Sequence, residues 1–364
     1  MTRIMNFNAG PATLPLPALE RARDELLDFE GSGMSIMEHS HRGKVYEAVH
    51  DEALRRLREL LGVPAAYDIL FLQGGGSMQF AMVPVSYLLP GTSADHVVNG
   101  AWGIKAQSEA AAWANVVGAR SRVAASTREG GFRRVSALRE VDLDPAAAYV
   151  HFTSNETIHG VQYLELPRFG DRPQVCDMSS DFLWRKIDVS PFAMIYAGAQ
   201  KNIGPSGVTV VVARRDFLDA GRKDIPSILQ YRAYSEARSL LNTPPTFGIY
   251  LVRNVALWIE SIGGLAAIER RNRAKAGALY AAVDARPDFY RCPVEKESRS
   301  MMNAVFRLPS EALESEFLEA AKRQGMAGLK GHRSVGGIRV SLYNAVEPAW
   351  VTALADFMKD FANR

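Results

Sequence analysis

Hydrophobic residues recur at helical spacing from Val45 to Leu61, which predicts an amphipathic helix that ends near Gly62. Beyond this helix the chain changes to short apolar runs separated by helical stretches, among them residues 78–89. Apolar runs without polar alternation are typical of strands buried on both faces. The pattern therefore predicts an α/β fold with a largely parallel sheet between helices, with strands at residues 68–72, 96–98, 148–152, 175–178, 193–197 and 208–213.

The C-terminal part has a different order of elements. Helical periodicity dominates residues 246–285, and we expect the segment around 247–260 to bridge two parts of the molecule. This pattern predicts a smaller α+β unit beside the large sheet. Its expected elements are a strand at 303–308, a helix at 311–324, a strand at 337–343 and a last helix from Pro348.

Composition narrows the class of protein. The chain has 364 residues, of which 47% are hydrophobic and 23% charged, so more than one domain is expected. Its formal net charge is only +3 and no long block of Lys and Arg occurs, which argues against a nucleic-acid or membrane surface. No window approaches the roughly 18 uncharged apolar residues that a membrane span requires.

The two cysteines, Cys176 and Cys292, are isolated from each other and from any metal-ligand spacing. Such cysteines indicate reduced, packed thiols, as in a cytoplasmic protein, and no metal site. The N-terminal segment to Pro17 also lacks the charged and apolar regions of a secretory signal. We therefore expect a cytoplasmic location.

A glycine-rich segment, residues 73–77, separates a predicted strand from a predicted helix. Glycines let the backbone approach a ligand closely, and the N–H groups at a helix N-terminus favour an anion. Ser77 could add a hydroxyl donor. The segment matches neither the dinucleotide fingerprint nor the Walker loop, and alone it also fits a simple tight turn.

Two ionisable residues, Asp177 and Lys201, follow successive apolar strands. Ligands of open α/β sheets bind beyond the carboxyl ends of the strands. A carboxylate there can keep a pyridinium nitrogen protonated, and a held, partly desolvated lysine can form a Schiff base. Taken singly, Asp177 also fits a helix cap and Lys201 a surface lysine, although the small-residue turn at 204–207 is unusual for a surface lysine.

Two basic loops, residues 39–44 and 330–339, lie far apart in the sequence and contain glycine. Arginine binds carboxylate and phosphate groups with two parallel hydrogen bonds. If the loops converge, they could hold a small substrate with two anionic groups. Either loop alone also fits a solvated surface loop.

At these residues the chain resembles the phosphoserine aminotransferases, a family of fold-type-I enzymes that use pyridoxal 5′-phosphate. The resemblance runs nearly end to end, from Asn6 to Ala345. Its most specific strings are TSNETIHG at 153–160, QKNIGPSG at 200–207, NTPPT at 242–246 and GHRSVGG at 331–337.

The resemblance implies a large cofactor-binding domain at 16–262 with a mostly parallel seven-stranded sheet. A small α+β domain at 263–364 would include the N-terminal segment 1–15. Two chains would form a homodimer with shared active sites. The implied reaction, in serine biosynthesis, moves the amino group between O-phospho-L-serine/3-phosphohydroxypyruvate and glutamate/2-oxoglutarate by a ping-pong mechanism. The related 4-phosphohydroxythreonine, of vitamin B6 biosynthesis, needs the same anion sites.

The resemblance also implies roles toward the cofactor. Lys201 would hold it as a Schiff base and move a proton between the substrate Cα and the cofactor. Asp177 would pair with the pyridine nitrogen, Trp102 would stack on the ring, and Thr153 would hydrogen-bond on the side of its phenolic oxygen. The cofactor phosphate would be held by Gly76, Ser77 and Gln200, and by Asn242 and Thr243 from the other subunit.

The substrate-binding roles fall on the basic loops. Arg339 would take the α-carboxylate of the substrate. The substrate phosphate, or the side-chain carboxylate of glutamate, would be surrounded by His41, Arg42, His332 and Arg333.

Three positions depart from the family pattern. Ser77 stands where some relatives carry arginine, which changes how the cofactor phosphate is neutralised. His159 stands where an acidic residue is expected, and Ala9 replaces a serine of some relatives. These departures concern substrate preference rather than the class of reaction.

Other functions stay open on the residues alone. The same fold could carry out desulfurase, lyase or alanine–glyoxylate aminotransferase chemistry. A desulfurase needs a mobile nucleophilic cysteine, but Cys176 lies within an apolar strand and Cys292 precedes Pro293. A non-catalytic scaffold protein would be expected to have lost Lys201, Asp177 or the glycine segment.

Overall fold

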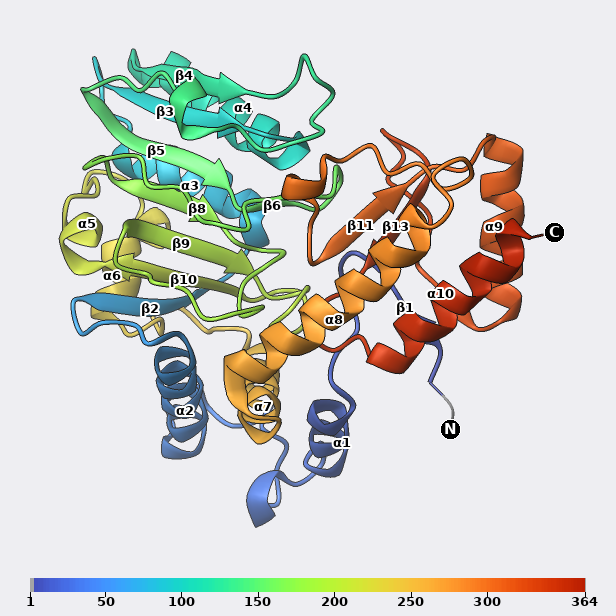
Figure 1. The fold of residues 1–364 in the computed structure, drawn as a ribbon. Helices are drawn as coiled ribbons and strands as arrows, with labels where there is room; N and C mark the ends of the chain where they lie inside the picture. The colour runs from blue at the N-terminus through green and yellow to red at the C-terminus, as the bar shows by residue number, and fades with distance from the viewer. Residues whose placement is uncertain (1–2, 364) are drawn as a thin grey trace.

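The computed structural model describes residues 3–363, and its larger part is built on a seven-stranded sheet (Figure 1). The strand order is β2-β10-β9-β8-β5-β3-β4, and only β10 runs antiparallel to its neighbours. The predicted α/β fold with a mostly parallel sheet is therefore confirmed. The strands are β2 (Tyr67–Leu72), β3 (Ser93–Val98), β4 (Arg120–Ser126), β5 (Ala147–Thr153), β8 (Gln174–Asp177), β9 (Phe192–Gly198) and β10 (Thr209–Arg214).

Helices cover both faces of the sheet. Because successive residues of each strand point to opposite sides, neighbouring residues of one strand belong to different cores. On one face Tyr196 belongs to a core with residues of α3 and α4, together with α5 and α6. On the other face Ile195 belongs to a core with residues of α2 and α7. The helices are α2 (Lys44–Leu61), α3 (Gly75–Tyr87), α4 (Ala101–Val117), α5 (Arg215–Asp219), α6 (Tyr231–Glu236) and α7 (Thr246–Ser261).

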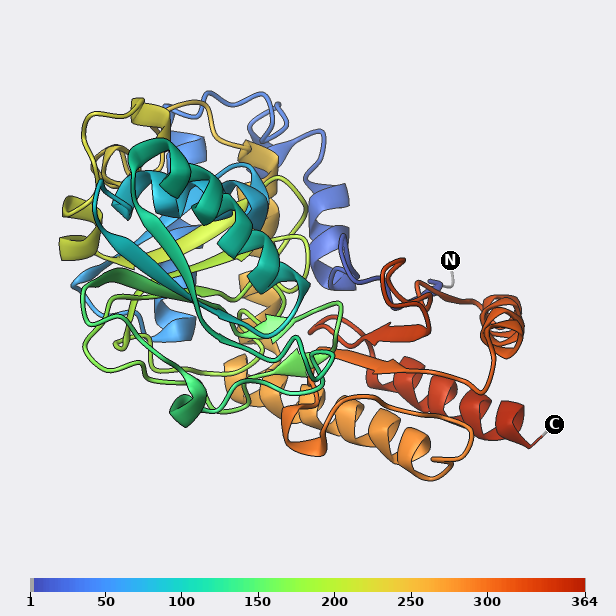
Figure 2. The same cartoon turned by 90° about the horizontal axis from the view of Figure 1, so that it is seen from above.

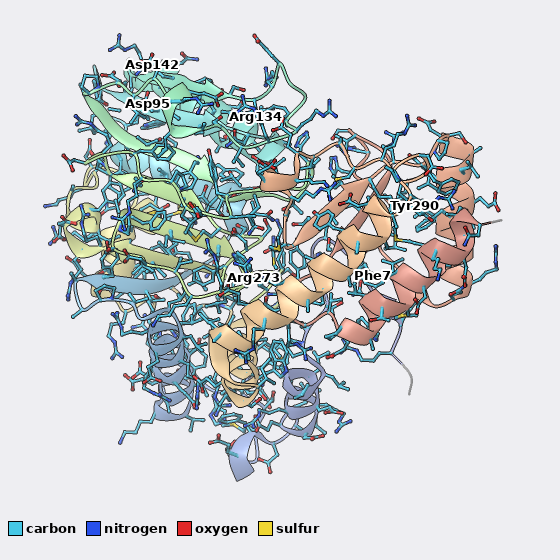
Figure 3. The ribbon with its side chains drawn as sticks, viewed as in Figure 1. Phe7, Asp95, Arg134, Asp142, Arg273 and Tyr290 are labelled. Atoms are coloured by element: carbon cyan, nitrogen blue, oxygen red, sulfur yellow. The ribbon has the colours of Figure 1, made fainter. Side chains whose placement is uncertain are left out.

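A smaller α+β unit lies beside this layered part, and both ends of the described chain lie there (Figure 2). Its core gathers Phe7, Tyr290, Phe317 and Phe357, of which the first two are labelled in Figure 3. β11 (Asn303–Phe306) pairs antiparallel with β13 (Ile338–Ser341), and β1 (Met5–Asn6) pairs parallel with β12 (Met326–Ala327). Its helices are α8 (Gly264–Asp284), α9 (Glu311–Arg323) and α10 (Pro348–Ala362).

The bridge between the two parts is α8, so its predicted position at 247–260 is wrong. The α7 side chains that belong to a hydrophobic core, such as Ile249 and Trp258, pack within the larger part. In α8, by contrast, Ile268 belongs to the core of the larger part and Leu279 to the core of the smaller one. Ile262 and Gly263 separate the two helices, and Gly263 and Gly264 both have positive φ values, which explains why one hydrophobic stretch forms two helices.

The edge strand β4 was not among the strands predicted from the pattern. Most of its residues are exposed or half-buried, so it lacks the continuous apolar run of a central strand. The remaining short elements are α1 (Leu16–Asp24), β6 (Asn155–Glu156) and β7 (Val161–Gln162), and the 3₁₀ turns at Phe29–Gly31, Leu138–Glu140, Ser227–Leu229 and Lys296–Ser298.

Within residues 3–363, none of the helices is by itself both long and apolar enough to cross a membrane. Only α7 and α8 taken together meet that requirement, and the pair is bent by 82°.

Candidate active site

The candidate site lies at the carboxyl ends of three adjacent parallel strands. Thr153 ends β5, Asp177 ends β8, and Lys201 follows β9 by three residues. In the register of the sheet Thr153 lies opposite Asp177, and Asp177 lies opposite Tyr196 of β9. The chain topology therefore brings together polar side chains that are up to 48 residues apart in the sequence, at the edge where α/β sheets bind ligands.

Lys201 is a buried lysine with one polar partner. Its Nζ donates a hydrogen bond to Oγ1 of Thr157 at 2.7 Å, and its side chain is 8% exposed. Burial lowers the pKa of Lys201 to about 8, against the opposing charge of Asp177. Because a neutral amine is the nucleophilic form of lysine, this environment prepares Lys201 to react with a carbonyl group.

Asp177 is buried beside Lys201. Its Oδ1 accepts a hydrogen bond from the backbone N–H of Ser179 at 2.9 Å. Burial raises the pKa of Asp177, and the bonds from Ser179 and the charge of Lys201 oppose that shift. A cationic group placed against this carboxylate would favour its ionised form.

The glycine-rich segment forms the N-terminus of α3. Gly74 is the N-cap residue with φ of 85°, and a Cβ atom at this position would lie 2.5 Å from Cβ of Met78, so glycine is required. No side chain caps this helix. The N–H groups of its first turn, which include those of Gly76 and Ser77, are therefore available to an anion.

Trp102 lies in the first turn of α4 and forms a wall of the same space. Nζ of Lys201 lies 5.5 Å from the centroid of the Trp102 ring. The backbone N–H groups of Trp102 and Gly103 donate to the carboxylate of Glu156 at 2.9 and 2.7 Å. Burial raises the pKa of Glu156 to about 7, although both N–H groups favour the ionised form. Glu156 thus caps α4 from a distant part of the chain.

The opposite rim of the site comes from the smaller unit. Arg339 belongs to β13, and burial lowers its pKa. His332 lies in the second basic loop, where its Nδ1 and Oγ of Ser334 are 2.8 Å apart. Burial and the neighbouring charge of Arg339 lower the pKa of His332. Arg339 and His332 of the smaller unit line the same cavity as Lys201 of the larger unit, and the charge of Arg339 helps to lower the pKa of Lys201.

Eight of the predicted site residues line one cavity with an open volume of about 230 Å³: Gly76, Ser77, Trp102, Asp177, Gln200, Lys201, His332 and Arg339. Thr153 is buried at the sheet end beside Asp177 but does not line the cavity. The other predicted residues also lie outside the cavity of this chain: His41, Arg42, Asn242, Thr243 and Arg333.

Several cavity residues were not predicted: Ala9, Gly10, Phe80, Thr157, Ile158 and Ser179. Thr157 lies within the TSNETIHG string, and its place beside Lys201 depends on a turn that sequence spacing alone does not predict. Glu156, in the same string, acts through the backbone of α4. For Phe80 no signal was available, because it looks like any other core aromatic of α3.

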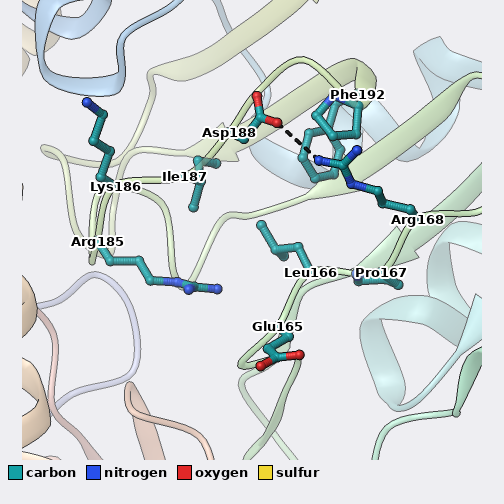
Figure 4. Close-up of a pocket in the computed structure, with 10 residues that line it drawn as sticks. Glu165, Leu166, Pro167, Arg168, Arg185, Lys186, Ile187, Asp188 and Phe192 are labelled. Atoms are coloured by element: carbon teal, nitrogen blue, oxygen red, sulfur yellow. Dashed lines mark hydrogen bonds and ion pairs between the residues drawn. The ribbon is translucent and has the colours of Figure 1, made fainter.

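A second cavity, drawn in Figure 4, lies away from these groups. Its walls include Glu165, Arg185 and Lys186, and an ion pair joins Arg168 to Asp188 at 3.2 Å. None of the predicted site residues lines it. It is therefore separate from the candidate active site.

Comparison with known proteins identifies the family. The model of the class-V aminotransferase family matches residues 4–354. Phosphoserine aminotransferase of Niallia circulans is 51% identical over 359 residues, which cover 99% of this chain and 98% of the relative. The phosphoserine aminotransferase of Geobacillus kaustophilus strain HTA426 is 52% identical over 364 residues, which cover 100% of this chain and 99% of the relative. The chain therefore belongs to the class-V aminotransferases, and these full-length relatives are phosphoserine aminotransferases.

Solved structures agree with this assignment. The phosphoserine aminotransferase of Bacillus circulans subsp. alkalophilus has a TM-score of 0.96 and 51% identity, with 99% of both chains covered. A PLP-bound phosphoserine aminotransferase from Trichomonas vaginalis has a TM-score of 0.93 and 37% identity, covering 98% of this chain and all of that one. The predicted pyridoxal phosphate dependence and aminotransferase activity are thereby confirmed. A ureidoglycine–glyoxylate aminotransferase from Bacillus subtilis, at 15% identity, shows only that the fold is shared. The glyoxylate-type alternative is not favoured, because the full-length relatives at about half identity are phosphoserine aminotransferases.

The chemistry of the cavity also fits pyridoxal phosphate. Two buried polar atoms have no hydrogen-bond partner among the described residues: Nε1 of Trp102, which lines the cavity, and Oγ1 of Thr153, which lies opposite Asp177 in the sheet. Buried polar groups of this kind are rare unless a ligand completes them. An uncapped helix N-terminus for a phosphate, a buried carboxylate for a ring nitrogen and a lysine of lowered pKa for an aldehyde match the cofactor's functional groups.

Proposed function

We propose that this enzyme moves the amino group between O-phospho-L-serine and 2-oxoglutarate, as a step of serine biosynthesis. One observation supports the proposal most directly: Lys201 lines one cavity together with the sheet carboxylate Asp177 and the donor groups Arg339 and His332. Phosphoserine carries its amine between a carboxylate and a phosphate. A lysine faced by donors for two anions suits such a substrate.

Each cofactor contact falls on a group of suitable chemistry. When bound, pyridoxal phosphate supplies an electron sink that lets the Cα–H bond of the amino acid break. The Lys201 amine would take the Cα proton, and the hydroxyl of Thr157 holds that amine at 2.7 Å. Asp177 would bind the ring nitrogen, and Trp102 and Thr153 would contact the ring with its phenolic oxygen. The cofactor phosphate would be bound by Gly76, Ser77 and Gln200.

The substrate would be held by the rim. Nε of Arg339 is buried without a partner among the described residues, which suits an α-carboxylate ligand. The substrate phosphate, or the side-chain carboxylate of glutamate, would be bound by His332, Arg333, His41 and Arg42. Arg42 donates from its Nε to the ring of His41 at 3.3 Å and is otherwise exposed, so its guanidinium can take an anion.

Single substitutions test this pocket. We expect Arg42→Ala and Arg333→Ala each to lower kcat/KM for phosphoserine at least about 10-fold, since a hydrogen bond to a charged group contributes about 1.5–3 kcal/mol. The matched control is Arg323→Ala, which removes an exposed arginine from the end of α9. Unchanged phosphoserine turnover in both loop variants would show that the assigned phosphate pocket is wrong.

We further propose a homodimer with shared active sites. Support comes from Asn242 and Thr243, which lie outside the cavity of their own chain although Nε2 of Gln73 donates to the Thr243 carbonyl at 3.2 Å. A second support is a group of exposed large apolar residues near the N-terminus, which a partner could cover. They are Leu16, Leu26, Leu27, Met34, Met37 and Val45.

Mixing two inactive variants tests the shared sites. One variant carries Lys201→Ala, and the other carries Asn242→Ala together with Thr243→Ala. If the sites are shared, half of the sites in a mixed dimer combine an intact lysine with intact residues 242 and 243. We expect activity to return after joint refolding. No recovery, in a sample whose sedimentation shows mixed dimers, contradicts shared sites.

Three finer proposals complete the assignment. 4-Phosphohydroxythreonine presents the same carboxylate, amine and phosphate, so it would be a second substrate, in pyridoxine biosynthesis. Turnover below that of unphosphorylated threonine would contradict this.

A cytoplasmic location is supported by the two unpaired cysteines, Cys176 and Cys292. Fractionation of the host cells tests it.

The proposed domains are residues 16–262 and residues 263–364 with 1–15; residues 1, 2 and 364 lie outside the described part. The pairing of β1 with β12 and the place of Phe7 in the smaller core support joining the N-terminal segment to the small domain. Limited proteolysis that cuts first between α7 and α8 would agree with the boundary. First cuts inside either range would oppose it.

A further inference from the structure

Lys105 lies one helical turn after Trp102 on α4, outside the family-derived set of site residues. Its Nζ donates a hydrogen bond to Oγ of Ser77 at 3.2 Å. The same Nζ lies 5.9 Å from the centroid of the Trp102 ring. The side chain thus crosses from α4 to the first turn of α3 and places a positive charge beside the uncapped N-terminus of that helix.

The proposed phosphate cradle otherwise lacks a charged donor. Gly76, Ser77 and Gln200 are neutral, as are Asn242 and Thr243. A phosphate monoester carries about −1.5 to −2 charges at pH 7, and a helix N-terminus offers only about half a positive charge. The other cations of the cavity, Lys201 and Arg339, are used by the cofactor aldehyde and the substrate carboxylate in the proposed function. A dianion in this cradle needs another cation.

We propose that Lys105 is the cation of the cofactor phosphate subsite, a binding residue that makes up for the serine at position 77. Lys105 donates to Oγ of Ser77, so the hydroxyl hydrogen of Ser77 stays free to point at a phosphate oxygen. The remaining ammonium hydrogens can reach the same anion. This inference rests on the proposed binding of the cofactor phosphate at Gly76 and Ser77.

A plainer role is that of a solvated lysine with an incidental hydrogen bond. Lys105 is exposed, and exposed pairs contribute little to stability. The two roles differ in one measurable respect. Only a phosphate ligand makes the affinity for pyridoxal phosphate, but not for pyridoxal, depend on the charge of Lys105.

The test measures the dissociation constants of pyridoxal phosphate and of pyridoxal for the apoenzyme, by absorbance titration. The variants are Lys105→Met and Lys105→Arg, with Lys359→Met on α10 as a control that removes an exposed lysine from the smaller unit. We expect Lys105→Met to weaken pyridoxal phosphate binding about 10- to 100-fold, which is the range of one charge-assisted hydrogen bond. Pyridoxal binding stays unchanged, and Lys105→Arg restores most of the loss.

A loss of less than about two-fold, or an equal loss for both ligands, overturns the proposal. Raising the salt concentration provides a second readout, because it should narrow the difference between wild type and Lys105→Met. No amino acid is present in these titrations. If the wild type binds pyridoxal phosphate but does not react with phosphoserine, the proposed substrate fails while the role of Lys105 is judged separately.

Discussion

The steric fit between Gly100 and Glu156 gives the sharpest prediction about how the ring wall is positioned. Gly100 is the N-cap residue of α4, and its φ of 174° is open to any residue. A Cβ atom at Gly100 would nevertheless lie 2.5 Å from both Cδ and Oε2 of Glu156. Gly100→Ala must therefore push the buried carboxylate away from the N–H groups of Trp102 and Gly103.

The size of the effect follows from the bonds that would be lost. Hydrogen bonds to a charged group contribute about 1.5–3 kcal/mol each, and overpacking a filled site costs about 1–3 kcal/mol. Partial relaxation recovers some of this, so we expect Gly100→Ala to lower the free energy of unfolding by about 3–5 kcal/mol. Because Trp102 lies in the released turn, binding of pyridoxal phosphate should weaken as well.

The assay is urea denaturation of the apoenzyme, followed by circular dichroism, for a double-mutant cycle. The cycle compares Gly100→Ala, Glu156→Ala and the variant with both changes. Once Glu156 is truncated the added methyl group has space, so the second change should then cost less than about 1 kcal/mol. Additive costs, or a Gly100→Ala midpoint equal to that of the wild type, would refute the reasoning.

Further predictions concern pH, substrate binding and the contact between the two units. The pKa of Lys201 is lowered to about 8, so the rate at which the apoenzyme captures pyridoxal phosphate should rise with pH up to about 8 and then level off. A rate that continues to rise up to pH 10.5 would contradict the lowered pKa. The pKa of Glu156 is raised from 4.5 to about 7, so the stability that this shift contributes is complete below pH 4.5 and is lost as the pH rises to 7. The difference in unfolding free energy between the wild type and Glu156→Gln should therefore fall between these two pH values. A difference that does not change with pH would contradict the raised pKa. Arg339→Ala should lower kcat/KM by about 30- to 1,000-fold, because about 2–4 kcal/mol of substrate-binding free energy is lost, and Arg339→Lys should recover part of it. If steady-state kinetics show a kcat/KM for Arg339→Ala near that of the wild type, Arg339 does not bind the substrate. Asn155→Ala deletes hydrogen bonds of 2.8 Å to Ser180 and Asn303 and of 2.6 Å to Ser300. It should lower the free energy of unfolding by about 2–4 kcal/mol, and the thermal midpoint with it. An unchanged midpoint would mean that this network does not hold the two units together.

Much of the fold followed from the hydrophobic pattern, because central strands of a sheet that is covered on both faces are apolar throughout. β8, β9 and β10 were predicted to within one or two residues at each end for that reason. Strand β4 was not predicted because only Ala124 and Ala125 of this strand are buried, which leaves no continuous apolar run. The helix that bridges the two units was predicted at the position of α7 instead of α8, because apolar periodicity does not reveal the turn at Gly263 and Gly264.

The site was predicted less completely than the fold. Asp177 and Lys201 were found from their positions after strands, and the structure brings them into one cavity. Thr157 and Glu156 depend on chain reversal after β5, which only three-dimensional packing determines. Lys105 gave no signal because an exposed helical lysine is common. Asn242, Thr243, His41 and Arg42 lie outside the cavity, so a single chain leaves their proposed roles as predictions.

The most direct test of the proposed function is a titration of the cofactor-loaded enzyme with O-phospho-L-serine in the absence of any oxo acid. Unphosphorylated serine serves as the matched control. We predict that phosphoserine alone converts the bound cofactor from its aldehyde-derived form to its amine form, seen as a change of the visible absorbance band. Equal conversion by both amino acids would contradict a phosphate-selective pocket, and no conversion by either would contradict phosphoserine as the substrate.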